Sequence, residues 1–274
     1  MKTVLFTKPS PLKRESEDAL IANAADGIYG VLDGVTPLAS LYDPAAVFKD
    51  ENGHNGAYLA ANLFKACLEE PGNGRELTDR IRDANRKLRG KMLDYGIDLE
   101  IRHELWATCI AAVQVLPDTI RFAQLGDCMA LARYADGQIR VLTKDPVKGL
   151  SKRAKAKRER DRKNGLDVKD ESYYADPIHS MIYNRWLANT PDGYGVANGM
   201  EEAGEYMQSG LIEREGLTEI LLVSDGMFHP ELTLESAMEL MLADGFERYV
   251  EKVEQAEREK GIRPDDRSAV LLKL

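Results

Sequence analysis

Val31-Leu32-Asp33-Gly34 and Leu221-Leu222-Val223-Ser224-Asp225-Gly226 are two apolar runs, far apart in the chain, that each lead into Asp-Gly. Such runs are typical of strands in a buried sheet, and the glycine lets the backbone turn sharply after the strand. Leu125-Gly126-Asp127 and Pro264-Asp265-Asp266 place further aspartates in similar settings. Strands that deliver carboxylates to one sheet edge create a hard-oxygen site, which Mg²⁺ and Mn²⁺ prefer. The pattern therefore predicts a divalent-metal site.

An Asp-Gly pair is more often an ordinary turn, because glycine accepts a positive φ and aspartate bonds its own backbone. Asp136-Gly137 fits that explanation, since strand-like runs flank it closely on both sides. Asp33-Gly34 and Asp225-Gly226 differ, because no return strand follows either pair at hairpin distance. Carboxylates that converge repel one another, and a bound divalent ion relieves the repulsion. We therefore favour metal ligation at these two pairs.

Length and composition fit one sheet-rich domain spanning 1–274, with 43% hydrophobic and 30% charged residues. The formal net charge of −9 argues against a general nucleic-acid binder, so we expect no nucleic-acid partner. Three cysteines without CxxC spacing indicate reduced thiols, and we expect a cytoplasmic protein. No apolar run approaches the roughly 20 residues of a membrane span. We expect no membrane partner, and a monomer.

The strands fall early, in the middle and last, with helices between them in blocks. A parallel sheet would alternate strand and helix strictly, so the order predicts an α+β fold with mostly antiparallel strands. The predicted strands are 4–7, 19–23, 27–32, 105–116, 119–125, 129–134, 138–142, 219–223 and 268–274, and the predicted helices are 57–70, 75–95, 232–243 and 247–260. Residues 148–163 are strongly basic and residues 165–217 are polar and weakly periodic, which predicts a flap or insertion at about 148–217 over the sheet edge.

Seven short motifs along the chain, in their order, resemble the metal-dependent serine/threonine phosphatases of the protein phosphatase 2C (PPM) family, in particular its bacterial type. They are Ser16-Glu17-Asp18-Ala19, Val31-Leu32-Asp33-Gly34, Trp106-Ala107-Thr108, Gly126-Asp127-Cys128, Leu142-Thr143-Lys144-Asp145, Ser224-Asp225-Gly226 and Asp265-Asp266-Arg267-Ser268. The resemblance implies an α-β-β-α sandwich of two mostly antiparallel sheets flanked by helices. It also implies a phosphorylated protein substrate, whose phosphoserine or phosphothreonine ester is hydrolysed by a water activated by two metal ions, Mn²⁺ or Mg²⁺.

The resemblance also implies a role for each matching residue at the metal centre. The metal ligands would be Asp33, Asp225 and Asp265 through carboxylates, Gly34 through its carbonyl, Glu17 or Asp18 through bridging waters, and Asp127 near an optional third ion. The basic residue that holds the phosphate would be Lys13 by strict spacing. Arg14 is one residue away, and its planar fork suits phosphate better. Asp266 stands where the family more frequently has Asn.

Two other classes of protein compete with an active phosphatase of this family. Asp33-Gly34 also resembles haloacid-dehalogenase-type phosphatases, but these need a nucleophilic aspartate two residues earlier, where this chain has Val31. A catalytically silent relative, kept as a regulatory or binding protein, is the stronger rival. The chain has the carboxylates of Asp33, Asp225 and Asp265, and their presence favours an active enzyme over a silent relative.

Basic residues crowd the stretch 148–163. Glu159 and Asp161 interrupt the run and no aromatic residue interleaves with it, which favours a solvated helix over a nucleic-acid surface. A further hypothesis is that Lys155, Lys157 and Arg158 attract anionic phosphosubstrates toward the metal site.

Overall fold

The computed structural model describes residues 1–72 and 74–274 and contains two five-stranded antiparallel sheets packed face to face. The first sheet has the order β1 (Lys2–Lys8), β10 (Arg267–Lys273), β9 (Leu217–Val223), β6 (Met129–Tyr134) and β7 (Ile139–Val141). The second has the order β2 (Asp18–Asn23), β3 (Ile28–Gly34), β4 (Thr108–Val115), β5 (Thr119–Leu125) and β8 (Gln208–Glu213). Every pairing within them is antiparallel.

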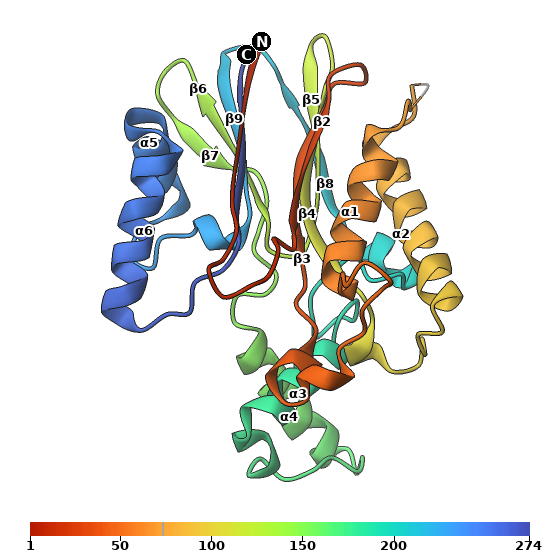
Figure 1. The fold of residues 1–274 in the computed structure, drawn as a ribbon. Coiled ribbons are helices and arrows are strands. Elements are labelled where there is room, and N and C mark those ends of the chain that lie inside the picture. The colour runs from red at the N-terminus through yellow and green to blue at the C-terminus, as the bar shows by residue number, and fades with distance from the viewer. Residues whose placement is uncertain (73) are drawn as a thin grey trace.

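Helices cover the outer face of each sheet, as Figure 1 shows. The helix α1 (Gly56–Glu69) and the helix α2 (Leu77–Asp94) lie on the second sheet, and α5 (Leu234–Asp244) and α6 (Phe246–Lys260) lie on the first. The predicted α+β sandwich of two antiparallel sheets flanked by helices is therefore confirmed. Short 3₁₀ helices complete the path: η1 (Leu38–Leu41), η2 (Pro44–Ala46), η3 (Arg102–Glu104), η4 (Tyr173–Ala175), η5 (Glu201–Glu205) and η6 (Asp225–Met227).

Central strands such as β3 and β9 are mostly apolar on both faces because the middle of each sheet is buried on both sides. Successive side chains of a strand point to opposite faces. Val31 therefore packs between the sheets, together with Leu222 and Val270 of the first sheet. Its neighbour Leu32 packs instead under α1 and α2. This double burial explains why the runs before Asp33 and Asp225 lack the alternation of a half-exposed strand.

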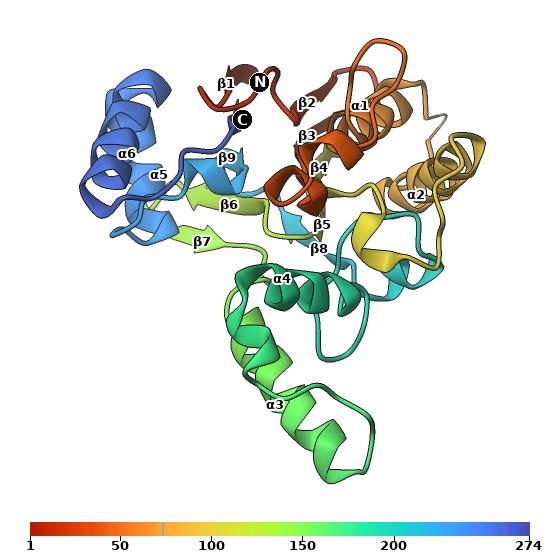
Figure 2. The same cartoon turned by 60° about the horizontal axis from the view of Figure 1, so that its bottom comes forward.

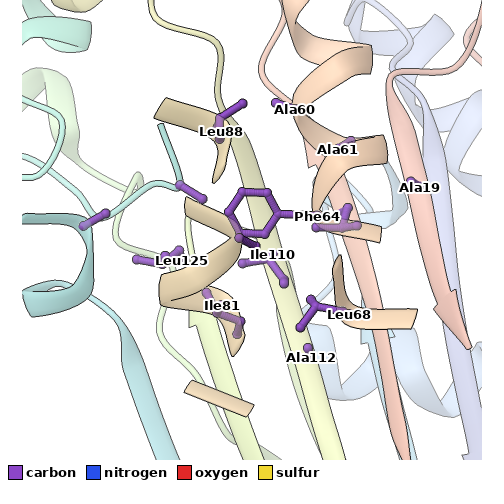
Figure 3. Packing of buried hydrophobic residues seen from close by; sticks show 14 of the residues in the cluster. Ala19, Ala60, Ala61, Phe64, Leu68, Ile81, Leu88, Ile110, Ala112 and Leu125 are labelled. Carbon is purple, nitrogen blue, oxygen red and sulfur yellow. The ribbon is translucent and has the colours of Figure 1, made fainter. Parts of the chain in front are cut away.

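Phe64 of α1 anchors the helical layer on the second sheet and is fully buried. Figure 3 shows its ring between Leu88 and Ile81 of α2 and over Ile110 of β4. The first sheet carries a corresponding helical layer, in which Met238 of α5 is part of the buried cluster between the helices and the sheet. Both helical layers thus fix the sheets from outside and leave their ends open for the site.

The segment 148–217 contains α3 (Leu150–Lys163) and α4 (Pro177–Trp186), and Figure 2 shows α3 extending away from the body. Residues 208–213 of this segment form β8, which pairs with β5, although the sequence analysis predicted no strand there. The strand is short and lies at the sheet edge, and its residues alternate between half-buried and exposed. One domain over 1–274 with a flap at about 148–217 stays a prediction.

Two further local predictions, the ordinary turn at Asp136-Gly137 and the unpaired cysteines, are confirmed. Asp136-Gly137 is the turn between β6 and β7, where Gly137 has φ +86° and Asp136 accepts a bond from the backbone N–H of Gln138. The cysteines Cys67, Cys109 and Cys128 are free. Within the described part of the chain, no helix combines the length and apolar character needed to span a bilayer.

Candidate metal centre

Three aspartates from three separate connections meet where the two sheets end. Asp33 is next to last in β3, Asp127 lies in the turn between β5 and β6, and Asp225 opens η6 after β9. One carboxylate oxygen from each lies within 4.8 Å of those of the other two. Together with Asp265 they line a cleft of about 310 Å³. Of the four aspartates expected to converge, Asp33, Asp127 and Asp225 form the close cluster, and Asp265 only lines the cleft.

Negative charge in this cleft is concentrated and poorly compensated. Burial, and then the neighbouring carboxylate of Asp225, raises the pKa of Asp33 well above its usual value. Burial and the carboxylate of Asp127 do the same to the pKa of Asp225. Among the described residues, the buried oxygens Asp18 Oδ1 and Asp225 Oδ1 have no hydrogen-bond partner. Crowded carboxylates with unpartnered oxygens are the donor set that fits a divalent cation.

Asp18 lies directly behind this cluster, because β2 and β3 pair Asp18 with Asp33. The hydroxyl of Ser224 donates to Asp18 Oδ2 at 2.9 Å, which ties β2 to the turn that carries Asp225. Burial raises the pKa of Asp18 to about 7, against the lowering effect of its hydroxyl partners. Asp18 therefore belongs to the same electrostatic cluster as the three converging aspartates.

Gly34 is required by the close approach of two chains. A Cβ at this position would lie 2.6 Å from the carbonyl oxygen of Ala57 and 2.7 Å from that of Glu17. Its backbone N–H also donates to the Glu17 carbonyl at 3.1 Å. Gly34 lines the cleft of the aspartates, so glycine here brings the backbone to the site.

Lys13 lies among carboxylates and pairs with Asp265. Its ammonium nitrogen is 2.7 Å from Asp265 Oδ1, 2.8 Å from Glu17 Oε2 and 2.9 Å from Asp266 Oδ2. Burial lowers the pKa of Lys13, but the carboxylates of Glu17 and Asp265 outweigh it and raise that pKa above its usual value. Asp265 lines the cleft but does not join the close cluster of Asp33, Asp127 and Asp225.

Glu17 is buried and held on several sides. It accepts a hydrogen bond from Asn55 Nδ2 at 2.6 Å, as well as bonds from the hydroxyl of Thr36 and from Lys13. These contacts fix its side chain, which lines a neighbouring cleft and not the cleft of the aspartates.

Asp266 is a residue whose role the sequence analysis missed. It is 1% exposed, and it accepts bonds from the backbone N–H groups of Ser10 at 2.7 Å and Glu17 at 2.9 Å. It thereby ties the loop that carries Lys13 to the end of β10. A charged residue where the family more frequently has neutral Asn needs a nearby countercharge, and Lys13 provides it. The aspartate at position 266, in place of the family's more frequent asparagine, was therefore the sequence feature that could have revealed this role.

Arg14 points elsewhere. Its guanidinium packs over Gly53, where a Cβ would come within 2.5 Å of Arg14 Nη1. It lines a second cleft, of about 540 Å³, whose wall also includes Asp265. Among the described residues, Arg14 has no hydrogen-bond or ion-pair partner. It is exposed and open to an anionic ligand.

The helix α4 contributes two residues to the aspartate cleft that sequence reasoning did not find. Arg185 lines both clefts and donates to the carbonyl oxygen of Thr36 at 2.9 Å. Asn184 also lines the aspartate cleft, and its buried Oδ1 has no partner within the described chain. The segment that contains them is polar and weakly periodic, so the sequence offered no signal for either residue.

Comparison with known proteins agrees with this geometry. A sequence model described as protein phosphatase 2C matches residues 14–271. The chain therefore belongs to the protein phosphatase 2C family, and by that membership it is a protein serine/threonine phosphatase. The predictions of family and enzyme class are confirmed. No curated protein matches the chain.

Solved structures share the fold at low sequence identity. The Mycobacterium tuberculosis serine/threonine phosphatase PstP/Ppp superposes with a TM-score of 0.62 at 17% identity, covering 100% of this chain and 98% of that one. PstP in complex with two manganese ions gives 0.61 at 15%, covering 98% and 96%. Stp1 from Staphylococcus aureus gives 0.60 at 15%, covering 100% and 94%.

The pairing of Lys13 with Asp266 can be tested by stability. Lys13→Met leaves a buried carboxylate without its countercharge, and we expect a loss of about 2–4 kcal/mol in the free energy of unfolding. Adding Asp266→Asn should recover part of that loss, because the buried carboxylate of Asp266 is removed while that of Glu17 still lacks Lys13. Urea denaturation of the metal-free single and double variants measures this. Strictly additive effects of the two substitutions would contradict the pairing.

The crowded aspartates predict a pH dependence. An aspartate whose pKa is raised on folding, as for Asp18 to about 7, keeps its proton more tightly in the folded state. The metal-free protein should therefore lose stability as pH rises from about 4 toward about 7, by up to about 1.4 kcal/mol for each unit by which folding raises the pKa of a group.

Urea denaturation with chelator at pH 5 and pH 8 measures this loss, and adding Mn²⁺ at pH 8 should reverse it. Asp225→Asn should flatten the pH dependence and weaken the Mn²⁺ effect. Asp136→Asn, in the β6–β7 turn, is the control and should change neither. Equal stability at both pH values with no effect of Mn²⁺ would contradict both the raised pKa values of the aspartates and metal binding by them.

Proposed function

We propose that this chain hydrolyses phosphoserine and phosphothreonine esters of protein substrates, with two Mn²⁺ or Mg²⁺ ions bound at the aspartate centre. The observation that carries the proposal is the convergence of Asp33, Asp127 and Asp225, together with the unpartnered buried oxygens of Asp18 and Asp225. Support also comes from PstP of the same fold, whose structure holds two manganese ions. Bound ions would polarise the phosphoryl group and make a water nucleophilic near neutral pH.

Four residues of this chain would bind the ions directly. Asp33, Asp225 and Asp265 would bind ions through carboxylates, and Gly34 through its carbonyl. Since Asp265 is paired with Lys13, ion binding would compete with Lys13 for that carboxylate.

Three further acidic residues would contribute through water or at an additional ion. Glu17 and Asp18, which are held by neighbouring side chains, would contact ions through water. Asp127 lies in the close cluster and would serve an additional ion.

Arg14, rather than Lys13, is the residue we propose for holding the substrate phosphate. Lys13 is engaged by three carboxylates, so its positive charge is already compensated. Arg14 lies at the neighbouring cleft with its fork unengaged by the described residues. A guanidinium binds phosphate through two parallel N–H bonds, which suits this role.

Catalysis itself is tested by metal-dependent turnover. We expect Mn²⁺-dependent hydrolysis of para-nitrophenyl phosphate and of a phosphothreonine peptide. Asp225→Asn should lower kcat/KM by about 100-fold or more, because one ion loses a charged ligand. Asp136→Asn serves as the control and should retain activity. If wild-type turnover with Mn²⁺ does not exceed that of Asp225→Asn, the chain is a catalytically silent relative.

The role of Arg14 is tested by competition with inorganic phosphate. Arg14→Ala should weaken inhibition by phosphate about 10–100-fold, as expected for a lost hydrogen bond to a charged group, with a parallel rise in KM. Arg14→Lys should recover part of this, because it keeps the charge but not the fork. Unchanged phosphate inhibition in Arg14→Ala would assign the phosphate to another base.

A further inference from the structure

A second cleft opens directly beside the metal centre. It measures about 540 Å³, and Thr36, Arg185 and Asp265 belong to the walls of both clefts. A phosphorylated side chain that reached the aspartates would therefore leave the adjoining residues of its own chain in this second cleft. A volume of this size is ample for several amino-acid side chains.

The walls of this second cleft are basic, although the chain as a whole has a net charge of −9. Its bases are Lys13, Arg14, Lys49, Arg185 and Arg263, and its acids are Glu15, Glu17 and Asp265. All three acids already have partners within the protein. Glu15 is bonded to His54 at 2.7 Å, and Glu17 and Asp265 are both paired with Lys13.

Lys49 and Arg263 are the bases that neither the metal centre nor the proposed phosphate contact uses. They come from opposite ends of the sequence, Lys49 from the loop after η2 and Arg263 from the loop before β10. Both side chains are exposed, and neither has a hydrogen-bond or ion-pair partner in residues 1–72 and 74–274. Two unengaged cations on the walls of one cleft create a site for an acidic ligand.

Apolar side chains lie between these charges. Leu12 and Leu41 line the same cleft and are 57% and 44% exposed. A surface that combines exposed leucines with unengaged bases fits a peptide better than it fits a small inorganic anion.

We infer that this second cleft binds the polypeptide segment next to the phosphorylated residue, and that Lys49 and Arg263 select substrates with acidic side chains in that segment. The inference rests on the proposed function, because it assumes that the phosphorylated residue enters the aspartate cleft. It names the substrate class as phosphoproteins with Asp or Glu near the phosphorylation site.

The basic helix α3 is a weaker source of such selectivity. Lys157 is paired with Asp161 at 2.6 Å, and Arg158 with Glu171 at 2.9 Å. The Arg158 side chain is 5% exposed and its guanidinium stacks on Tyr174 at 4.1 Å. Lys157 and Arg158 therefore stabilise the α3–α4 segment. Of the three bases expected to attract phosphosubstrates, only Lys155 is exposed.

The test compares matched phosphothreonine peptides that carry either acidic or alanine residues beside the phosphothreonine. We expect wild-type kcat/KM to be about tenfold higher for the acidic peptide, since each exposed charge pair contributes a factor of about 2–5. The Lys49→Ala/Arg263→Ala variant should bring that ratio near one. High salt should also reduce the wild-type ratio, because screening weakens exposed charge pairs.

The matched control is Lys2→Ala/Lys273→Ala, which removes the same charge from the opposite end of the first sheet, where these two residues face each other. It should keep the wild-type ratio. Equal turnover of both peptides by the wild-type protein would overturn the inference. A preference that survives in Lys49→Ala/Arg263→Ala would also overturn it.

A binding measurement separates this inference from the proposed function. Fluorescence anisotropy of an unphosphorylated acidic peptide, with chelator present, needs neither metal nor turnover. Binding that is weakened about tenfold by Lys49→Ala/Arg263→Ala, but not by the control, supports the docking site even if the enzyme is silent. Absence of metal-dependent turnover refutes the proposed function alone, and equal affinity for acidic and neutral peptides refutes the docking site alone.

Discussion

Repulsion between carboxylates held together at the sheet ends is the constraint on which the rest of the site depends. Asp33, Asp127 and Asp225 converge within a few ångströms, and Asp18 lies behind them. Burial removes the water that would screen these charges, so their pKa values rise. The fold must hold the cluster together against this cost. The cation that we propose for the cluster would relieve this repulsion on binding, and the relief would contribute to its binding affinity.

The surrounding structure fixes the turns that carry the aspartates. Arg267 is 2% exposed, and its guanidinium donates to the carbonyl of Gly226 while pairing with Glu257 of α6. A Cβ on Gly226 would lie 1.9 Å from the carbonyl oxygen of Asp266, so only glycine allows the two loops to meet. A buried ion pair and a close backbone contact thus hold Asp225 in place from the helical layer.

The sequence was sufficient for most of the framework because burial imposes clear periods on it. Strands buried on two faces give continuous apolar runs, and the missing return strand after Asp33-Gly34 and Asp225-Gly226 separated them from the ordinary turn at Asp136-Gly137. The edge strand β8 escaped prediction because its residues are only half-buried on one side. Asn184 and Arg185 escaped because α4 meets the cleft through tertiary packing, which leaves no local pattern.

The partners of Lys13 could not be predicted because spacing alone does not choose among nearby carboxylates. Glu17 is four positions after Lys13, but Asp265 and Asp266 come from the other end of the chain. The choice depends on how β10 leads out of its loop, which only the folded structure defines. Asp266 without a countercharge would be an unpaired buried ion, so its presence and that of Lys13 are one structural feature. A lysine paired in this way neutralises the protein's own negative charge, which is why we propose that bases with unengaged donors bind the anionic substrate.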